Sequence, residues 1–145
     1  MSELDDLYQE VILDHGRRPR NRRAMPDGSH RCDGYNPLCG DHVLVAVRMD
    51  GEAIADVAFE GEGCAICMAS ASLMTEIVRG HTVPEFDQAF DAVRALVRGE
   101  PGSQEMGKLA VFGGVAAFPM RVKCATLAWH TAKAALHGAT EATTE

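Results

Sequence analysis

The sequence lacks the features that mark membrane, secreted and nucleic-acid-binding proteins. It has no apolar run near the roughly 20 residues of a membrane span, and no basic segment leads into an apolar stretch as in an export signal. Basic residues are also scarce, because 14 Lys and Arg stand against 21 Asp and Glu and leave a net charge of -7. A negative chain is a poor electrostatic match for a phosphate backbone. We therefore expect a cytoplasmic protein that binds neither membranes nor nucleic acid.

Several catalytic motifs and the signs of a disulfide framework are missing as well. The chain contains no G-x-S-x-G, no P-loop and no G-x-G-x-x-G motif. Its cysteines are odd in number, and there is no export signal; they are Cys32, Cys39, Cys64, Cys67 and Cys124. This combination favours metal or thiol chemistry over disulfides.

The apolar periodicity that is present predicts a single α+β domain over residues 1–145. At 46% apolar residues the chain can bury one real core. Helices are expected over Leu4–His15, Cys64–Arg79, Pro84–Arg98 and Pro119 to about His137. Strands are expected at His42–Met49 and Ala55–Phe59, with a third around His30–Tyr35. We therefore predict a small antiparallel β-sheet of about three strands packed against several α-helices, followed by a disordered tail over 139–145.

Two local features leave alternatives open. A two-residue hairpin loop would place Val43, Val45 and Val47 opposite Ala58, Asp56 and Ile54, whereas a three-residue loop with a left-handed Gly51 would place them opposite Val57, Ala55 and Ala53. We favour the second register. The arginine-rich segment 16–28 is expected to be an exposed basic loop, and a solvated linker is favoured over a docking patch.

Cysteines and one aspartate form a candidate metal site. Residues i and i+2 of an extended segment face the same way, so Cys39 and Asp41 can bind one ion, and Gly40 lets the backbone approach it. Cys64 lies at the first turn of its helix, where unpaired amides favour a thiolate. Cys124 lies near the start of the last helix. Three thiolates and a carboxylate supply the four donors that a tetrahedral zinc ion takes.

The other cysteines and the histidines have simpler interpretations. Cys32 and Cys67 are expected to be small core residues. The C-x-x-C spacing of Cys64 and Cys67 alternatively indicates redox chemistry at a helix start, although no thioredoxin-like order of strand and helix accompanies it. Structural roles are favoured for the three histidines that were considered as ligands, because none has metal-ligand spacing to a second histidine: His15, His42 and His130.

Four groups of motifs, taken together, resemble the IscU/SufU family of iron–sulfur cluster assembly proteins. They are LYQEVILDH with PRN, NPLCGD, GEGCAI with ASAS, and FPMRVKCATLAW, and the resemblance runs from Leu4 to about His137. Two features resemble the SufU-type branch. Lys123 stands where IscU-type proteins have histidine, and the 59 residues between Cys64 and Cys124 (65–123) include an excess around Pro84–Gly114 that resembles the SufU insertion.

The resemblance implies a zinc site made by Cys39, Asp41, Cys64 and Cys124. It also implies a role as a sulfurtransferase-type carrier, which accepts persulfide sulfur from a SufS-type cysteine desulfurase and passes it toward a SufB-type scaffold complex. Cys39 is the expected acceptor, because a loop cysteine before glycine moves more easily than one on a helix. Lys123 and Arg121 are expected to offset the negative charge of the site. A monomer or weak homo-oligomer is expected.

Two other functions compete with this expectation. The same cysteines could hold a transient [2Fe-2S] cluster, as in a scaffold protein; Lys123 in place of histidine weighs against it. A structural zinc module that only binds partners would favour a closed site of strong ligands. Asp41 binds zinc more weakly than a fourth thiolate would, which indicates a labile site.

Overall fold

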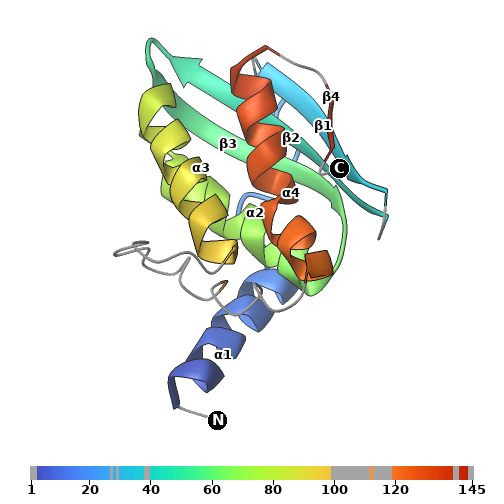
Figure 1. Cartoon of the computed structure of the whole chain (residues 1–145). Coiled ribbons are helices and arrows are strands. Elements are labelled where there is room, and N and C mark those ends of the chain that lie inside the picture. Colours follow the sequence, from blue (N-terminus) through green and yellow to red (C-terminus); the bar gives the residue numbers. More distant parts are fainter. Residues whose placement is uncertain are drawn as a thin grey trace.

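The computed structural model confirms the expected α+β class (Figure 1). It describes residues 3–26, 28, 30–37, 40–98, 112, 119–138 and 141–143. The elements are α1 (Glu3–Arg17), β1 (His30–Asn36), β2 (Asp41–Asp50), β3 (Ala53–Glu62), α2 (Ala65–Val78), α3 (Val83–Val97), α4 (Pro119–Leu136) and β4 (Glu141–Thr143). Within these ranges no helix has the length and apolar character needed to cross a membrane.

The sheet has the order β3-β2-β1-β4. As predicted, β1, β2 and β3 pair antiparallel. The fourth strand was not predicted, because we expected a disordered tail over 139–145. The structure instead pairs β4 in parallel with β1, with Gly34 opposite Ala142. The outer side of β1 offers unpaired backbone N–H and C=O groups, and β4 satisfies some of them.

The β2–β3 hairpin differs from both predicted registers. Val43, Val45 and Val47 lie opposite Gly61, Phe59 and Val57. The loop is Gly51-Glu52, between paired Asp50 and Ala53, and a register shift occurs between Arg48 and Met49. Gly51 does adopt the predicted left-handed conformation, with φ +61. The irregularity adds one residue to β3. The pairs beyond it are therefore shifted by one residue from the pairs that the loop length alone predicts.

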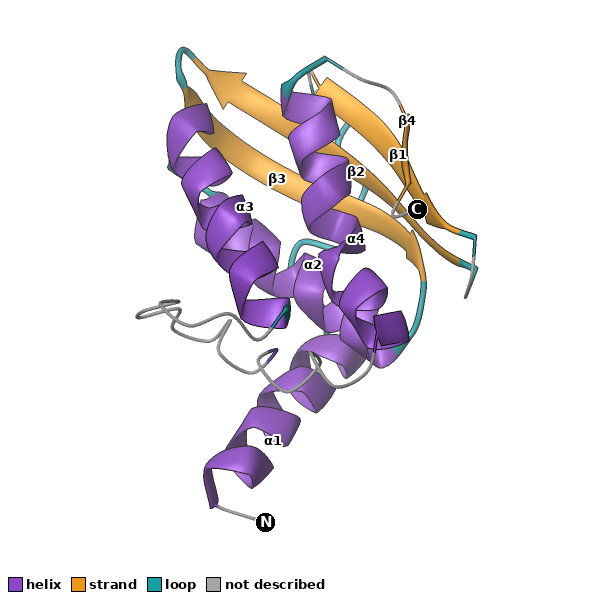
Figure 2. Cartoon of the chain, in the orientation of Figure 1, coloured by secondary structure: helices purple, strands orange, loops and turns teal. Residues whose placement is uncertain are grey.

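Helices cover one face of the sheet and form the main core there. Figure 2 shows α2, α3 and α4 on the same side of the strands; α4 contacts β1 and β2, whereas α2 contacts β3. Val43, Val45 and Phe59 point to this side and are fully buried. The ring of Trp129 on α4 stacks on that of Phe86 on α3, with centroids 5.7 Å apart. This stacking packs α3 against α4.

The first helix is fastened to α2 by a buried histidine. His15 is 1% exposed, and its Nδ1 lies 2.7 Å from the hydroxyl of Ser72. The same hydroxyl accepts the backbone N–H of Arg20 at 2.8 Å, so one oxygen joins α2 both to α1 and to the segment that follows it. Gly16 was expected to end the helix, but α1 continues to Arg17. A Cβ on Gly16 would lie 3.2 Å from the carbonyl oxygen of Ala65, so this glycine permits close helix packing.

The basic segment after α1 is more ordered than the predicted solvated linker. Phe59 of β3 donates its N–H to the carbonyl of Asn21 and accepts the N–H of Arg23, both at 3.0 Å. The guanidinium of Arg23 lies 2.6 Å from the carboxylate of Asp56. Met25 is buried in a small apolar cluster with Ala46 and Ala58. The segment therefore runs beside β3, although Arg22 and Arg23 stay exposed.

Candidate metal centre

Three of the predicted ligands come together where several elements meet. Asp41 is the first residue of β2, Cys64 stands between β3 and α2, and Cys124 lies in the first half of α4. Their ligand atoms all lie within 4.8 Å of one another. Asp41 and Cys124 are buried, whereas Cys64 is half-buried. The cluster therefore reaches the surface through Cys64.

The position of Asp41 is fixed by its neighbours on both sides. Its Oδ1 accepts the backbone N–H of Cys64 at 3.0 Å. Just before it, the N–H of Gly40 donates to the carbonyl of Asn36 at 2.9 Å, and Gly40 has φ +77. A residue with a side chain would be strained there. Among the described residues nothing lies within 4 Å of a Cβ at this position, so Gly40 serves the turn rather than a close backbone approach.

Cys64 caps the N-terminus of α2, as its place in the sequence predicts. Its backbone is extended, with φ -67 and ψ 168, and its Sγ accepts the N–H of Cys67 at 3.4 Å. The thiol also lies 3.7 Å from Oδ2 of Asp41, to which it donates. The free amides of a first helical turn favour negative charge on such a side chain. The Cys64 side chain is therefore held between the first turn of α2 and the carboxylate of Asp41.

Cys124 completes the group in a buried position. Burial raises the pKa of its thiol well above the ordinary value, and the hydrogen bonds and charges of Asp41 and Cys64 raise it further. The two sulfurs and the carboxylate thus repel each other's negative charge in a partly dehydrated space. A bound cation would reverse this balance and keep both thiols ionised.

The donor set fits a thiophilic metal ion. A tetrahedral zinc site has Zn–S distances near 2.3 Å, which places neighbouring ligand atoms about 3.5–3.8 Å apart. The 3.7 Å between Cys64 Sγ and Asp41 Oδ2 agrees with that spacing. Thiolates also bind iron–sulfur clusters, so the identity of the donors does not distinguish a zinc site from a cluster site.

The remaining predicted site residues are not part of this cluster as described. Cys39 lies outside the described residues, so its role as ligand and acceptor stays a prediction. Arg121 is exposed and Lys123 is half-buried directly before Cys124. Neither makes an ion pair with Asp41 in the part of the chain that the structure covers. Their charge support also stays a prediction.

The three histidines have other surroundings, in line with the structural roles favoured from sequence. His15 binds Ser72 in the α1–α2 contact. His42 lies exposed on β2 and pairs with Asp33 at 3.0 Å. The ring of His130 meets that of Phe90 edge-on at 5.1 Å, and burial, together with nearby cationic side chains, lowers its pKa.

Cys67, for which a core position was favoured from sequence, is also a neighbour of the cluster. It is fully buried, as expected of a core residue. Nevertheless, a Cβ built on Gly63 would lie 3.1 Å from Cys67 Sγ and 3.0 Å from Asp41 Oδ1. The sulfur therefore turns back toward the residue before Cys64. In the sequence, only the C-x-x-C spacing indicates that Cys64 and Cys67 are close. The short distance from Gly63 to the sulfur of Cys67 shows where that sulfur points.

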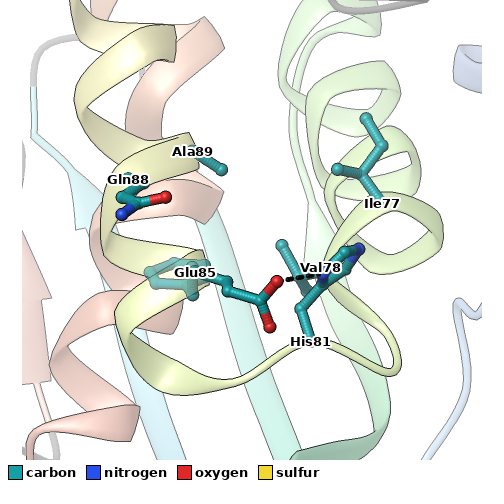
Figure 3. Close-up of a pocket in the computed structure, with 7 residues that line it drawn as sticks. Ile77, Val78, His81, Glu85, Gln88 and Ala89 are labelled. Carbon is teal, nitrogen blue, oxygen red and sulfur yellow. Dashed lines mark hydrogen bonds and ion pairs between the residues drawn. The ribbon is translucent and has the colours of Figure 1, made fainter.

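A separate cavity lies away from these residues. Its volume is about 350 Å³, and it opens between the end of α2 and the start of α3. Figure 3 shows Glu85 reaching His81 across it, where the two side chains lie 3.3 Å apart. Glu85 also forms a capping box with Thr82 at the start of α3. These polar groups are already used for helix capping, and the cavity contains none of the cluster residues.

A family profile described as the NifU-like N-terminal domain matches residues 7–125, which include Asp41, Cys64 and Cys124. The chain belongs to this family. The match covers the segments on which the resemblance to IscU/SufU proteins rests, and so confirms that resemblance.

Relatives within the family carry both names. The chain is 39% identical to "Iron-sulfur cluster assembly scaffold protein IscU" of Streptococcus pyogenes serotype M1 over 138 residues, 94% of this chain and 86% of the relative. It is also 39% identical to "Zinc-dependent sulfurtransferase SufU" of Bacillus subtilis (strain 168) over 130 residues, 88% of each chain.

A solved structure supports the SufU-type assignment. The crystal structure of FiSufU from the thermophile Fervidobacterium islandicum AW-1, described as a candidate scaffold protein for the SUF system, superposes with a TM-score of 0.84. It is 33% identical, with 94% of this chain and 99% of that chain covered. The fold of the chain therefore agrees with its assignment to the SufU-type branch of the family.

Proposed function

We propose that this protein acts in iron–sulfur cluster assembly as a zinc-dependent sulfurtransferase. The observation that carries the proposal is the convergence of Asp41, Cys64 and Cys124 within 4.8 Å. Similarity to a zinc-dependent sulfurtransferase over 88% of the chain supports it. We further propose that Cys39 is the fourth ligand and the sulfur acceptor. A SufS-type cysteine desulfurase would be the donor and a SufB-type complex the recipient.

The chemistry follows from thiol exchange. The thiolate of Cys39 attacks the terminal sulfur of the donor's persulfide, a new S–S bond forms on Cys39, and the donor cysteine leaves as a thiolate. No external oxidant is needed, because one S–S bond replaces another. When bound, Zn²⁺ would keep the site cysteines deprotonated at neutral pH. Asp41, held by Cys64, supplies a weaker ligand beside strong ones.

The residues before Cys124 have a proposed electrostatic role. Three thiolates and a carboxylate around a divalent cation carry a formal charge of -2, which nearby cations would reduce. Lys123 is next to Cys124 in the chain, and Arg121 is exposed on the same helix. Replacing either by glutamine should weaken metal retention or sulfur uptake, whereas Arg98→Gln at the C-cap of α3 should not.

A second candidate is an assembly scaffold for a transient [2Fe-2S] cluster. The equally identical relative that is named a scaffold protein favours it. In the family resemblance, Lys123 in place of histidine favours sulfur transfer. The cluster would be cargo in this case, held by the same cysteines.

One set of measurements distinguishes the candidates. The purified full chain would be analysed for metal and then mixed with a SufS-type desulfurase and cysteine. Stimulated sulfur release, zinc, and a mass gain of one sulfur atom on Cys39 support transfer. A coloured, iron-bearing protein whose behaviour does not depend on zinc supports the scaffold. Zinc without stimulation indicates a structural module. Cys39→Ser should abolish persulfide uptake, and Cys32→Ser is the matched control.

A further inference from the structure

We infer that Cys64 and Cys67 form a peroxide-responsive disulfide pair, which withdraws Cys64 from the candidate metal centre. This inference does not depend on sulfur transfer, because it rests on the contacts of these two residues. Cys64 is half-buried and can be reached from solvent, whereas Cys67 is fully buried. The pair therefore has an attackable thiol and a protected one.

The geometry brings the two side chains together. Cys64 caps α2, and its Sγ lies 3.4 Å from the backbone nitrogen of Cys67. Cys67 Sγ in turn points back along the helix, since it would lie 3.1 Å from a Cβ on Gly63. Side chains in helices lean toward the N-terminus, so this orientation costs no strain. Each sulfur is thus turned toward the backbone beside the other residue.

Closing the bond requires the Cβ atoms of Cys64 and Cys67 to come within about 3.5–4.5 Å of each other. Cys64 is the N-cap of α2 and has an extended backbone, so it is not held at the spacing of two helical residues. The segment before Cys64 can supply the movement, because Gly63 lies between β3 and α2 and has no side chain.

The reaction balances with hydrogen peroxide as the oxidant. The thiolate of Cys64 attacks one peroxide oxygen, an S–O bond forms, the O–O bond breaks, and hydroxide leaves. The sulfenic acid then reacts with the thiol of Cys67, so that an S–S bond forms and water leaves. The sulfurs together lose two electrons, which peroxide takes up. A dithiol reductant restores both thiols.

The consequence concerns both protection and metal retention. A sulfenic acid that finds no thiol can be oxidised further to irreversible sulfinic acid. Cys67 would prevent that outcome at Cys64. The oxidised pair also removes one of the three donors that lie within 4.8 Å. Oxidation should therefore release bound metal, and reduction should let the chain bind it again.

Peptide mapping of the full chain tests the inference. The zinc-loaded protein would be treated with peroxide, followed with a zinc-sensitive dye, and digested without reduction. We expect a peptide that contains a Cys64–Cys67 disulfide, zinc release, and recovery of zinc binding after reduction. In Cys67→Ser, zinc release should be irreversible, with sulfinic acid at Cys64. Cys32→Ser, which alters another buried thiol, should behave as the wild-type chain.

Several results would overturn the inference. They are a linkage through Cys39 or Cys124 in place of Cys67, sulfinic acid at Cys64 in the wild-type chain, and full recovery of zinc binding in Cys67→Ser. The wild-type map needs no variant, so a folding defect in Cys67→Ser would not prevent the test. Persulfide uptake is not measured, so a failure here is distinct from a failure of the proposed transferase activity.

Discussion

The carboxylate of Asp41 lies 3.0 Å from the backbone nitrogen of Cys64 and accepts its N–H. This bond joins the start of β2 to the start of α2, and it aligns two of the donors of the candidate metal centre. Asp41 thus has two separable properties: a hydrogen-bond acceptor that orders the backbone, and a charge that a metal ion would use.

Two substitutions of Asp41 should separate these properties. Asp41→Asn keeps an oxygen for the N–H of Cys64 but removes the charge, so we expect zinc affinity to fall by at least about tenfold with little loss of stability. Asp41→Ala also removes the acceptor, which should cost about 1–3 kcal/mol of the free energy of unfolding. Chelator competition and urea denaturation measure the two effects. Asp33→Asn, at an exposed carboxylate, is the control, and unchanged zinc affinity in Asp41→Asn would contradict the assignment.

Ser72→Ala should loosen the contact between α1 and α2. The buried hydroxyl binds Nδ1 of His15 at 2.7 Å and accepts the N–H of Arg20 at 2.8 Å. Removing it deprives the buried His15 and the half-buried Arg20 of this partner, so we expect a loss of about 1–3 kcal/mol. Urea denaturation gives the loss, and hydrogen exchange should show faster opening of α1. Gln88→Ala, at an exposed position of α3, should have no such effect; equal results for the two variants would argue against this role.

Asp56→Asn should lower stability in a pH-dependent way. Burial of Asp56 acts to raise its pKa, but the hydrogen bond and charge of Arg23, the N–H of Val57 and the charge of Arg79 outweigh it, and the net pKa is lowered. A carboxyl group with a lowered folded-state pKa stabilises the fold above its unfolded pKa of about 3.9, and this stabilisation is lost as the pH falls through the folded-state value.

The wild-type chain should therefore exceed Asp56→Asn in stability by about 1–2 kcal/mol at neutral pH. The difference should shrink as the pH falls below about 4. Urea denaturation at a series of pH values measures it. The exposed Asp91→Asn serves as the control. A difference that does not vary with pH would mean that Asp56 acts through shape rather than charge.

Gly34→Ala should disturb the packing of α4 on β1. A Cβ on Gly34 would overlap the side chain of Thr131, whose hydroxyl donates to the carbonyl of Leu127 at 2.7 Å. Overpacking of this kind typically costs about 1–3 kcal/mol. The double variant Gly34→Ala, Thr131→Ala should recover part of the loss, which a double-mutant cycle would show. A fully additive cycle would contradict the contact.

The candidate centre could be predicted from the sequence to a large extent. Asp41 and Cys64 follow local signals, namely a turn glycine before a strand and a helix start after glycines. Their proximity to Cys124 is a tertiary contact. It was expected from the family resemblance, because the sequence spacing of these residues does not predict it. The approach of Cys67 depends on Gly63 lacking a side chain, and no periodicity in the sequence encodes that contact.

The hairpin shows which part of a strand pairing is readable from sequence. Val43 was expected opposite Val57 and lies opposite Gly61. A shift of four residues preserves the side-chain alternation, so Val43 and its new partner still lie on one face of the sheet. The register itself depends on the irregularity between Arg48 and Met49, where alternation gives no signal. The tail strand β4 likewise depends on a free backbone edge of β1 rather than on its own sequence.

The two strands that flank β2 carry further backbone pairing on their outer sides along part of their length. β1 pairs with β4, and β3 bonds to Asn21 and Arg23 through Phe59 and to Gly80 and His81 through Ile54. Among the described residues, a partner that adds its own strand to β1 or β3 at these positions would have to displace these bonds. Recognition through side chains and helix ends would be easier to reverse, and this would suit the proposed carrier role, in which the protein leaves one partner before it meets the next.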